Sequence, residues 1–148
     1  FEGDMEKAIF HHEKAIEICP SDTYHIARYA VLLCYLGHPE KALIQIERAL
    51  RLDPFCSDLV LETQGLCLYL LRQHSEALST FKKMQIETRT SLFYCAACNK
   101  ALGNHDIAKQ TLKMAMSESE MTSEKFVSTQ LFQDKQTSEE LTEVLNSI

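Results

Sequence analysis

Cysteine is the residue with the most varied chemistry in this chain of 148 residues, which contains six of them. Cys95 and Cys98 form a Cys-x-x-Cys motif, the spacing found in redox pairs and in half of many zinc sites. A zinc site would need a second pair of ligands at a suitable spacing, and the sequence offers none. A redox pair would lie at a helix N-terminus, whereas this motif lies in the middle of an expected helix. The motif therefore predicts two packed side chains, with thiol or metal chemistry as the weaker alternative.

The other four cysteines fall mostly in apolar, helical contexts; they are Cys19, Cys34, Cys56 and Cys67. Free cysteines in such contexts behave as small buried hydrophobic residues. They are typical of proteins from a reducing compartment, where disulfides are rare. We therefore expect a cytoplasmic protein without a disulfide framework.

Histidine is the second candidate for chemistry. His11 and His12 are adjacent, so on a helix their side chains point about 100° apart and cannot share a metal ion. His38, His74 and His105 recur at one place in a repeated pattern, which favours a role in packing or in a turn. No Ser–His–Asp arrangement, Gly-rich phosphate loop or pair of carboxylates in a cleft can be assembled. We expect a protein that is not an enzyme and has no cofactor or metal.

The segments that carry these residues repeat along the chain. Four residues recur at an offset of 34: Gly3, Ala8, Ala15 and Pro20 are followed by Gly37, Ala42, Ala49 and Pro54. The small residue of this pattern appears in four copies, at Ala8, Ala42, Ala77 and Ala108. A period of this length indicates stacked helical units.

Apolar residues at helical spacing predict two helices in each unit. The expected helices span residues 4–18, 22–36, 39–52, 58–71, 74–86, 89–102 and 105–118. Ser21 or Asp22 is the expected N-cap of the second helix, and Asn104 that of the seventh. Gly37 is expected to end the second helix, and Pro39 to lie in the first turn of the third.

The pattern changes in residues 119–148. A short helix is expected from about Ser123, and a capping box at Thr137–Glu140 predicts the start of a last helix. These two helices do not form a further copy of the repeat. Because stacked repeats need a terminal element to cover their last apolar face, we expect residues 119–148 to be a C-terminal capping pair.

The repeat resembles the tetratricopeptide repeat, a helix–turn–helix unit of 34 residues. The resemblance covers about residues 1–117 and implies an all-α, right-handed superhelical solenoid with repeats at 1–20, 21–56, 57–88 and 89–118. The first repeat would be partial, since the chain begins in what the pattern places as a turn, and we expect a fragment of a longer protein. The resemblance implies that small residues and prolines fix the helix packing: Ala8, Ala42, Ala77, Ala108, Gly65, Pro20 and Pro54.

In this family the first helix of each pair lines a concave groove that binds a peptide or a neighbouring domain. The resemblance places these groove positions at Tyr24, Ala27, Val31, Cys34, Tyr35, Leu59, Glu62, Leu66, Tyr69, Leu70, Thr90, Phe93, Ala97, Lys100 and Ala101. This wall is apolar and aromatic, with one acid and one base. Family members that grip a chaperone's C-terminal carboxylate use Lys and Asn where this chain has Ala27, Val31 and Tyr35, so that function is disfavoured.

The resemblance therefore implies a non-enzymatic module that binds a protein or peptide, or another domain of the same polypeptide, as a scaffold or regulatory region. A self-associating or purely structural solenoid, including a homodimer, is the alternative. A second, weaker resemblance is to the repeat region C-terminal to some bacterial class III nucleotide cyclases and regulators. It rests on Leu50–Phe55, Gly65–Leu71 and the tail from Phe126 to Leu145, without that family's Pro before the last helix. It too implies a regulatory region.

Composition excludes other classes of partner. The apolar content of 45% and charged content of 24% are those of a globular domain. The net charge of −6, without a basic stripe, argues against nucleic-acid binding. The best apolar runs, Tyr29–Leu36 and Leu66–Leu71, are too short to span a bilayer, so no membrane partner is expected.

Overall fold

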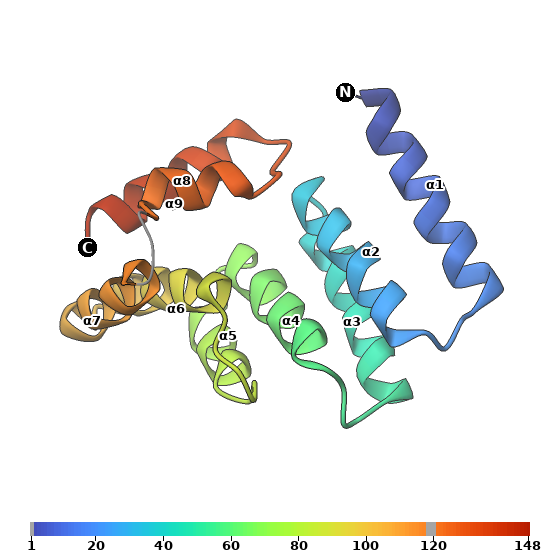
Figure 1. The fold of residues 1–148 in the computed structure, drawn as a ribbon, viewed down its shortest axis with the longest axis horizontal. Helices are drawn as coiled ribbons and strands as arrows, with labels where there is room; N and C mark the ends of the chain where they lie inside the picture. The colour runs from blue at the N-terminus through green and yellow to red at the C-terminus, as the bar shows by residue number, and fades with distance from the viewer. Residues whose placement is uncertain (1, 118–120) are drawn as a thin grey trace.

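The structure, a computed structural model, describes residues 2–117 and 121–148, with side chains from residue 4 onward. All regular structure in this part of the chain is α-helical (Figure 1). The helices are α1 (Glu2–Ile18), α2 (Thr23–Tyr35), α3 (Pro39–Leu52), α4 (Asp58–Leu70), α5 (His74–Phe81), α6 (Arg89–Ala101), α7 (His105–Met116), α8 (Ser123–Thr129) and α9 (Lys135–Asn146). None of these described helices combines the length and apolar character that a bilayer crossing requires.

Consecutive helices pack in pairs. Helix α2 packs on α3, α4 on α5 and α6 on α7, and each pair packs on the next. The first helices of neighbouring pairs also touch directly, α2 with α4 and α4 with α6. In Figure 1 the chain advances from α1 at one end to α7 at the other, and then α8 and α9 turn back alongside α6. The first helices α2, α4 and α6 therefore form one layer, and their side chains can contribute to a shared site.

Each of these three pairs turns at a residue in the left-handed conformation. Gly37 has a φ of 80° and Gly103 a φ of 79°, as the sequence predicts for a glycine that ends a helix. The third copy has Arg72 at this place, with a φ of 63°. A side chain in this conformation costs about 1 kcal/mol relative to glycine. The Arg72 guanidinium reaches α9, where it forms an exposed ion pair with Glu140.

Small residues lie where the helices approach most closely. Ala42, Ala77 and Ala108 are completely buried. Gly65 of α4 lies directly against the Phe81 ring of α5, and a Cβ added at Gly65 would overlap that ring. Ala8 is only half-buried, because α1 packs against α2 alone on this face.

The capping predictions are confirmed at the start of the chain's second and third helices. Asp22 is the N-cap of α2, and its carboxylate accepts a hydrogen bond from the His25 N–H at 3.1 Å. Pro39 is the first residue of α3. Pro20 and Pro54 follow the ends of α1 and α3 in exposed turns.

Other boundary predictions are wrong. Gly3 was expected in a turn, but its backbone is part of α1. Helix α5 ends at Phe81 instead of near residue 86, and the chain beyond it is held by Asp58 of α4. The two Asp58 oxygens accept hydrogen bonds from the backbone N–H groups of Gln85 and Ile86, each at 2.9 Å. These N–H groups therefore bond a side chain of another helix, α4, and not a carbonyl of α5.

The predicted capping box at Thr137–Glu140 is also wrong. Helix α9 begins at Lys135, and its N-cap is Asp134, which accepts hydrogen bonds from the N–H groups of Gln136 and Thr137. An Asp carboxylate accepts both bonds at once and so fixes the helix start earlier. Asn104 does occupy the N-cap position of α7, but its side chain makes no capping bond and donates instead to the Asn99 side chain. The expected end of α7 at residue 118 lies outside the described residues.

Candidate functional site

A cavity of about 170 Å³ lies between the first helices of the three pairs. We call it the central cavity; its lining residues are Arg28, Val31, Tyr35, Leu59, Glu62, Thr63, Leu66, Thr90 and Gln130. Six of the groove positions taken from the repeat resemblance meet here: Val31, Tyr35, Leu59, Glu62, Leu66 and Thr90. They come from three helices and are brought together because α2, α4 and α6 are neighbours.

The cavity combines an apolar wall with polar groups of both charges. Val31, Leu59 and Leu66 provide the apolar surface. Arg28 lies on the exposed rim and makes no ion pair with any described residue. Glu62 is partly buried, and its carboxylate accepts a hydrogen bond from the Thr88 hydroxyl at the start of α6. Burial raises the pKa of Glu62 above its ordinary value.

Tyr35 joins the central cavity to the C-terminal segment. Its hydroxyl donates to the Gln130 side-chain oxygen at 3.3 Å, and its carbonyl accepts from the Gln133 N–H at 2.7 Å. Its ring meets the Phe132 ring edge-on, with the centroids 5.2 Å apart. Residues 130–133 therefore close one side of the cavity and tie α8 to the end of α2.

Thr90 at the start of α6 lines the central cavity and Ala101 at its end is exposed, whereas other groove positions on α6 are covered by the chain itself. Phe93 is completely buried, and its ring stacks on that of Phe126 from α8 with 4.1 Å between centroids. Tyr94 donates its hydroxyl hydrogen to Gln130 at 2.9 Å. Lys100 donates to the Ser147 carbonyl oxygen at 2.8 Å. The two C-terminal helices thus occupy the part of the groove that α6 would offer to a partner.

Four further predicted groove residues do not line the central cavity: three are buried and one is exposed. Ala27 and Ala97 are completely buried between helices. Tyr69 is buried and packs its ring against Tyr94 and His74. Tyr24 is exposed, with its ring edge-on to His25. The structure therefore gathers five groove positions of α2 and α4, together with Thr90 of α6, at one cavity and packs most of the others into the interior.

The sequence reasoning missed Arg28, Thr63 and Gln130, which line the central cavity, and the covering roles of Phe126 and Phe132. Phe126 and Phe132 appear in the sequence as the apolar side of a terminal cap. The surface that they cover is determined by ring contacts with Phe93 and Tyr35, which are distant in the sequence. Helical periodicity does not reveal contacts between distant residues. Gln130 gave no signal at all.

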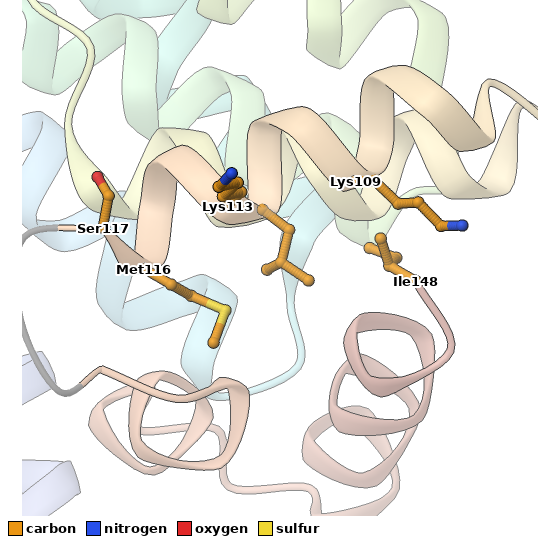
Figure 2. A pocket seen from close by; sticks show the side chains of 6 residues that line it. Lys109, Lys113, Met116, Ser117 and Ile148 are labelled. Carbon is orange, nitrogen blue, oxygen red and sulfur yellow. The ribbon is translucent and has the colours of Figure 1, made fainter.

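A second pocket, of about 420 Å³, lies between α7 and the end of α9. It is lined by Lys109, Leu112, Lys113, Met116, Ser117 and Ile148. Figure 2 shows Lys109 and Ile148 at one end of it and Met116 and Ser117 at the other. Its polar lining residues are the two lysines and Ser117, whose hydroxyl donates to the Met114 carbonyl oxygen, and no Asp, Glu or His side chain lines it.

Burial disfavours the reactive thiolate form of both cysteines in the Cys-x-x-Cys motif. Burial raises the pKa of Cys95 and of Cys98 to about 12, so both thiols are protonated at neutral pH. Within the described residues, no three His, Cys, Asp or Glu side chains are grouped to hold a metal ion. The sulfur contact that does occur was not predicted: Cys34 Sγ of α2 lies 3.4 Å from Cys67 Sγ of α4. Their separation of 33 residues, one less than the repeat, could have indicated it.

The function of the chain has to be argued from the repeat, the helix pairs and the central cavity. Comparisons with protein-family models and with curated proteins gave no match.

Proposed function

We propose that this chain is a tetratricopeptide-type right-handed superhelical solenoid and a non-enzymatic protein-binding module that takes a short segment of a partner protein in the central cavity. One observation carries the proposal. Positions that the repeat assigns to a groove, on three successive first helices, line a single cavity. Such a convergence follows from a regular stack of helix pairs, in which equivalent positions face the same side.

The size of the cavity favours a protein partner over a metabolite. Sites for small molecules are usually about 300–1,000 Å³, whereas the central cavity measures about 170 Å³. A space of this size suits one anchoring side chain of a longer ligand. Val31, Leu59 and Leu66 would contact an apolar anchor, and the hydroxyls of Tyr35 and Thr90 would bond the partner's backbone. Arg28 on the rim favours an acidic residue beside that anchor.

In this proposal the chain is a scaffold or regulatory region, and the partner is a separate protein or another domain of the same polypeptide. Helices α8 and α9 limit the groove to the part lined by α2, α4 and the start of α6, because they cover Phe93 further along α6. The free cysteines support a cytoplasmic location, since free thiols, of which Cys34, Cys67 and Cys98 are buried, suit a reducing compartment.

A peptide library tests the proposal. Random peptides displayed on phage would be selected on the immobilised chain, and an enriched peptide would be titrated by calorimetry into variants. Val31→Arg places a charged side chain in the cavity and should weaken binding at least tenfold, or about 1.4 kcal/mol. The matched control is Tyr24→Ala, which changes an exposed side chain outside the cavity. Equal affinity for wild type and Val31→Arg would show that the peptide binds elsewhere.

Self-association is the second candidate function, and the exposure of Phe55 favours it. This side chain is 96% exposed in the turn after α3, beside a pocket of about 410 Å³ that it helps to line. A large exposed aromatic residue next to a hollow with a mixed polar and apolar lining is typical of an interface. Light scattering of wild type and Phe55→Ser tests this alternative. A dimer that becomes monomeric in the variant would support it, and a monomeric wild type would exclude it.

A further inference from the structure

Two thiols meet directly behind the central cavity. Cys34 and Cys67 are almost completely buried, 1% and 0% exposed, and their sulfur atoms are 3.4 Å apart across the α2–α4 contact. No other two cysteines in the described residues make such a contact. We propose that Cys34 and Cys67 are a redox-sensitive pair, which hydrogen peroxide converts to a disulfide that joins α2 covalently to α4.

The geometry requires only a small rearrangement. A disulfide has its sulfur atoms about 2.05 Å apart, so the two sulfurs must approach by about 1.4 Å. Rotation of the two side chains and a slight shift of the helices can supply this, because α2 and α4 already pack against each other. The next residue after Cys34 is Tyr35 and the residue before Cys67 is Leu66, and both line the central cavity. The bond would therefore fix two walls of that cavity relative to each other.

The reaction balances with peroxide as the two-electron oxidant. The Cys34 thiolate attacks one peroxide oxygen, the O–O bond breaks, and a sulfenic acid and hydroxide result. The Cys67 sulfur then attacks the sulfenic sulfur, the S–S bond forms, and water leaves with the Cys67 proton. In sum, two thiols and one hydrogen peroxide give one disulfide and two water molecules.

The surroundings determine the rate of this reaction. The hydrogen bond between the two thiols and their burial raise the pKa of Cys34 far above its ordinary value. The thiolate is therefore scarce at neutral pH, and the pair should react slowly and only with a reagent as small as peroxide. Cys19, which is exposed, should react first with a larger alkylating agent. The disulfide would form whether or not the cavity binds a peptide.

Closing the loop between residues 34 and 67 should stabilise the fold. A loop of this length loses enough conformational freedom in the unfolded chain to raise the melting temperature by about 10 °C for a protein of this size. Dithiothreitol should reverse the increase. This shift distinguishes a crosslink within the native helix packing from oxidation of unfolded chains.

The test treats the full chain with hydrogen peroxide at mildly alkaline pH. The remaining thiols are then alkylated under denaturing conditions, and the digest is mapped by mass spectrometry. The expected product joins the Cys34 and Cys67 peptides with the loss of two hydrogen atoms, together with the increase of about 10 °C in melting temperature. Cys34→Ala and Cys67→Ala should each abolish both results, and Cys95→Ala should retain both.

Three results would overturn the inference. The first is the absence of a Cys34–Cys67 product under conditions that fully oxidise the exposed Cys19. The second is a product in which Cys34 or Cys67 is joined mainly to another cysteine. The third is a Cys34–Cys67 product whose melting temperature is no higher than that of the reduced chain, because the crosslink would then not fit the folded helices.

Discussion

Phe126 packs α8 against α6 through its ring. The substitution Phe126→Ala therefore tests how the C-terminal helices are attached to the rest of the fold. Its side chain is 3% exposed. The ring stacks on Phe93 with an interplanar angle of 8° and meets Tyr94 edge-on, with 5.7 Å between the centroids. Phe126→Ala removes both ring contacts and leaves a cavity against α6.

The expected cost follows from this environment. Truncation of a buried Phe to Ala costs about 3–5 kcal/mol, of which the two ring contacts account for about 0.5–1.5 kcal/mol each. Helices α8 and α9 pack mainly on each other and on α6. The loss should therefore appear first as local opening of α8 and α9, while α2 to α5 remain folded.

Native-state hydrogen exchange measures this opening. Amides of α8 and α9 should exchange at least about a hundredfold faster in Phe126→Ala, the equivalent of about 3 kcal/mol. Amides of α4 should change much less. The control is Leu131→Ala, which changes a 62% exposed side chain in the same segment and should alter stability by less than about 0.5 kcal/mol. Equal acceleration in α4 and α9, or no acceleration in either, would refute the proposed mode of attachment.

Three further predictions concern stability. Gly65→Ala should destabilise the chain by about 1–3 kcal/mol in urea unfolding, because the new methyl group overlaps the Phe81 ring, and an unchanged midpoint would contradict that packing. Arg72→Gly should relieve about 1 kcal/mol of strain from the left-handed backbone conformation. It also removes an exposed ion pair worth less than about 1 kcal/mol. The free energy of unfolding should therefore stay the same or rise slightly. Burial raises the folded-state pKa of Glu62 above its ordinary 4.5, so the folded state binds more protons there. Wild type should therefore lose stability relative to Glu62→Gln as pH rises from about 4.5 through the raised pKa, and should show no such loss below 4.5. A difference in stability between the two proteins that does not change with pH would contradict this prediction.

The local structure was largely predictable because its causes lie within a few residues in the sequence. Asp22, Gly37 and Pro39 fix helix ends through their own backbone and side-chain chemistry, and each was identified correctly. The early end of α5 was not predicted, because a distant residue supplies the partner. Asp58 of α4 holds the backbone at Gln85 and Ile86, which ends α5 early without any local signal.

The candidate site was predictable only in part, for the same reason. The repeat register identifies equivalent positions, and those on α2 and α4, such as Val31 and Glu62, do meet at one cavity. The register does not show that another part of the chain covers Phe93. That outcome depends on where residues 123–146 dock, and their sequence shows only that they have an apolar side.

Tyr35 acquires its partners late in synthesis. Gln130, which accepts its hydrogen bond, lies 95 residues further along the chain, whereas each helix pair can close as soon as its own residues have been made. At about 5–20 residues per second, a ribosome needs about 5–20 s for this interval. Phe93 and Tyr94, which α8 will cover, are made later in this interval and stay open until Phe126 has been made, 33 residues after Phe93. The growing chain therefore presents an aromatic surface that a chaperone could bind and that the completed protein hides.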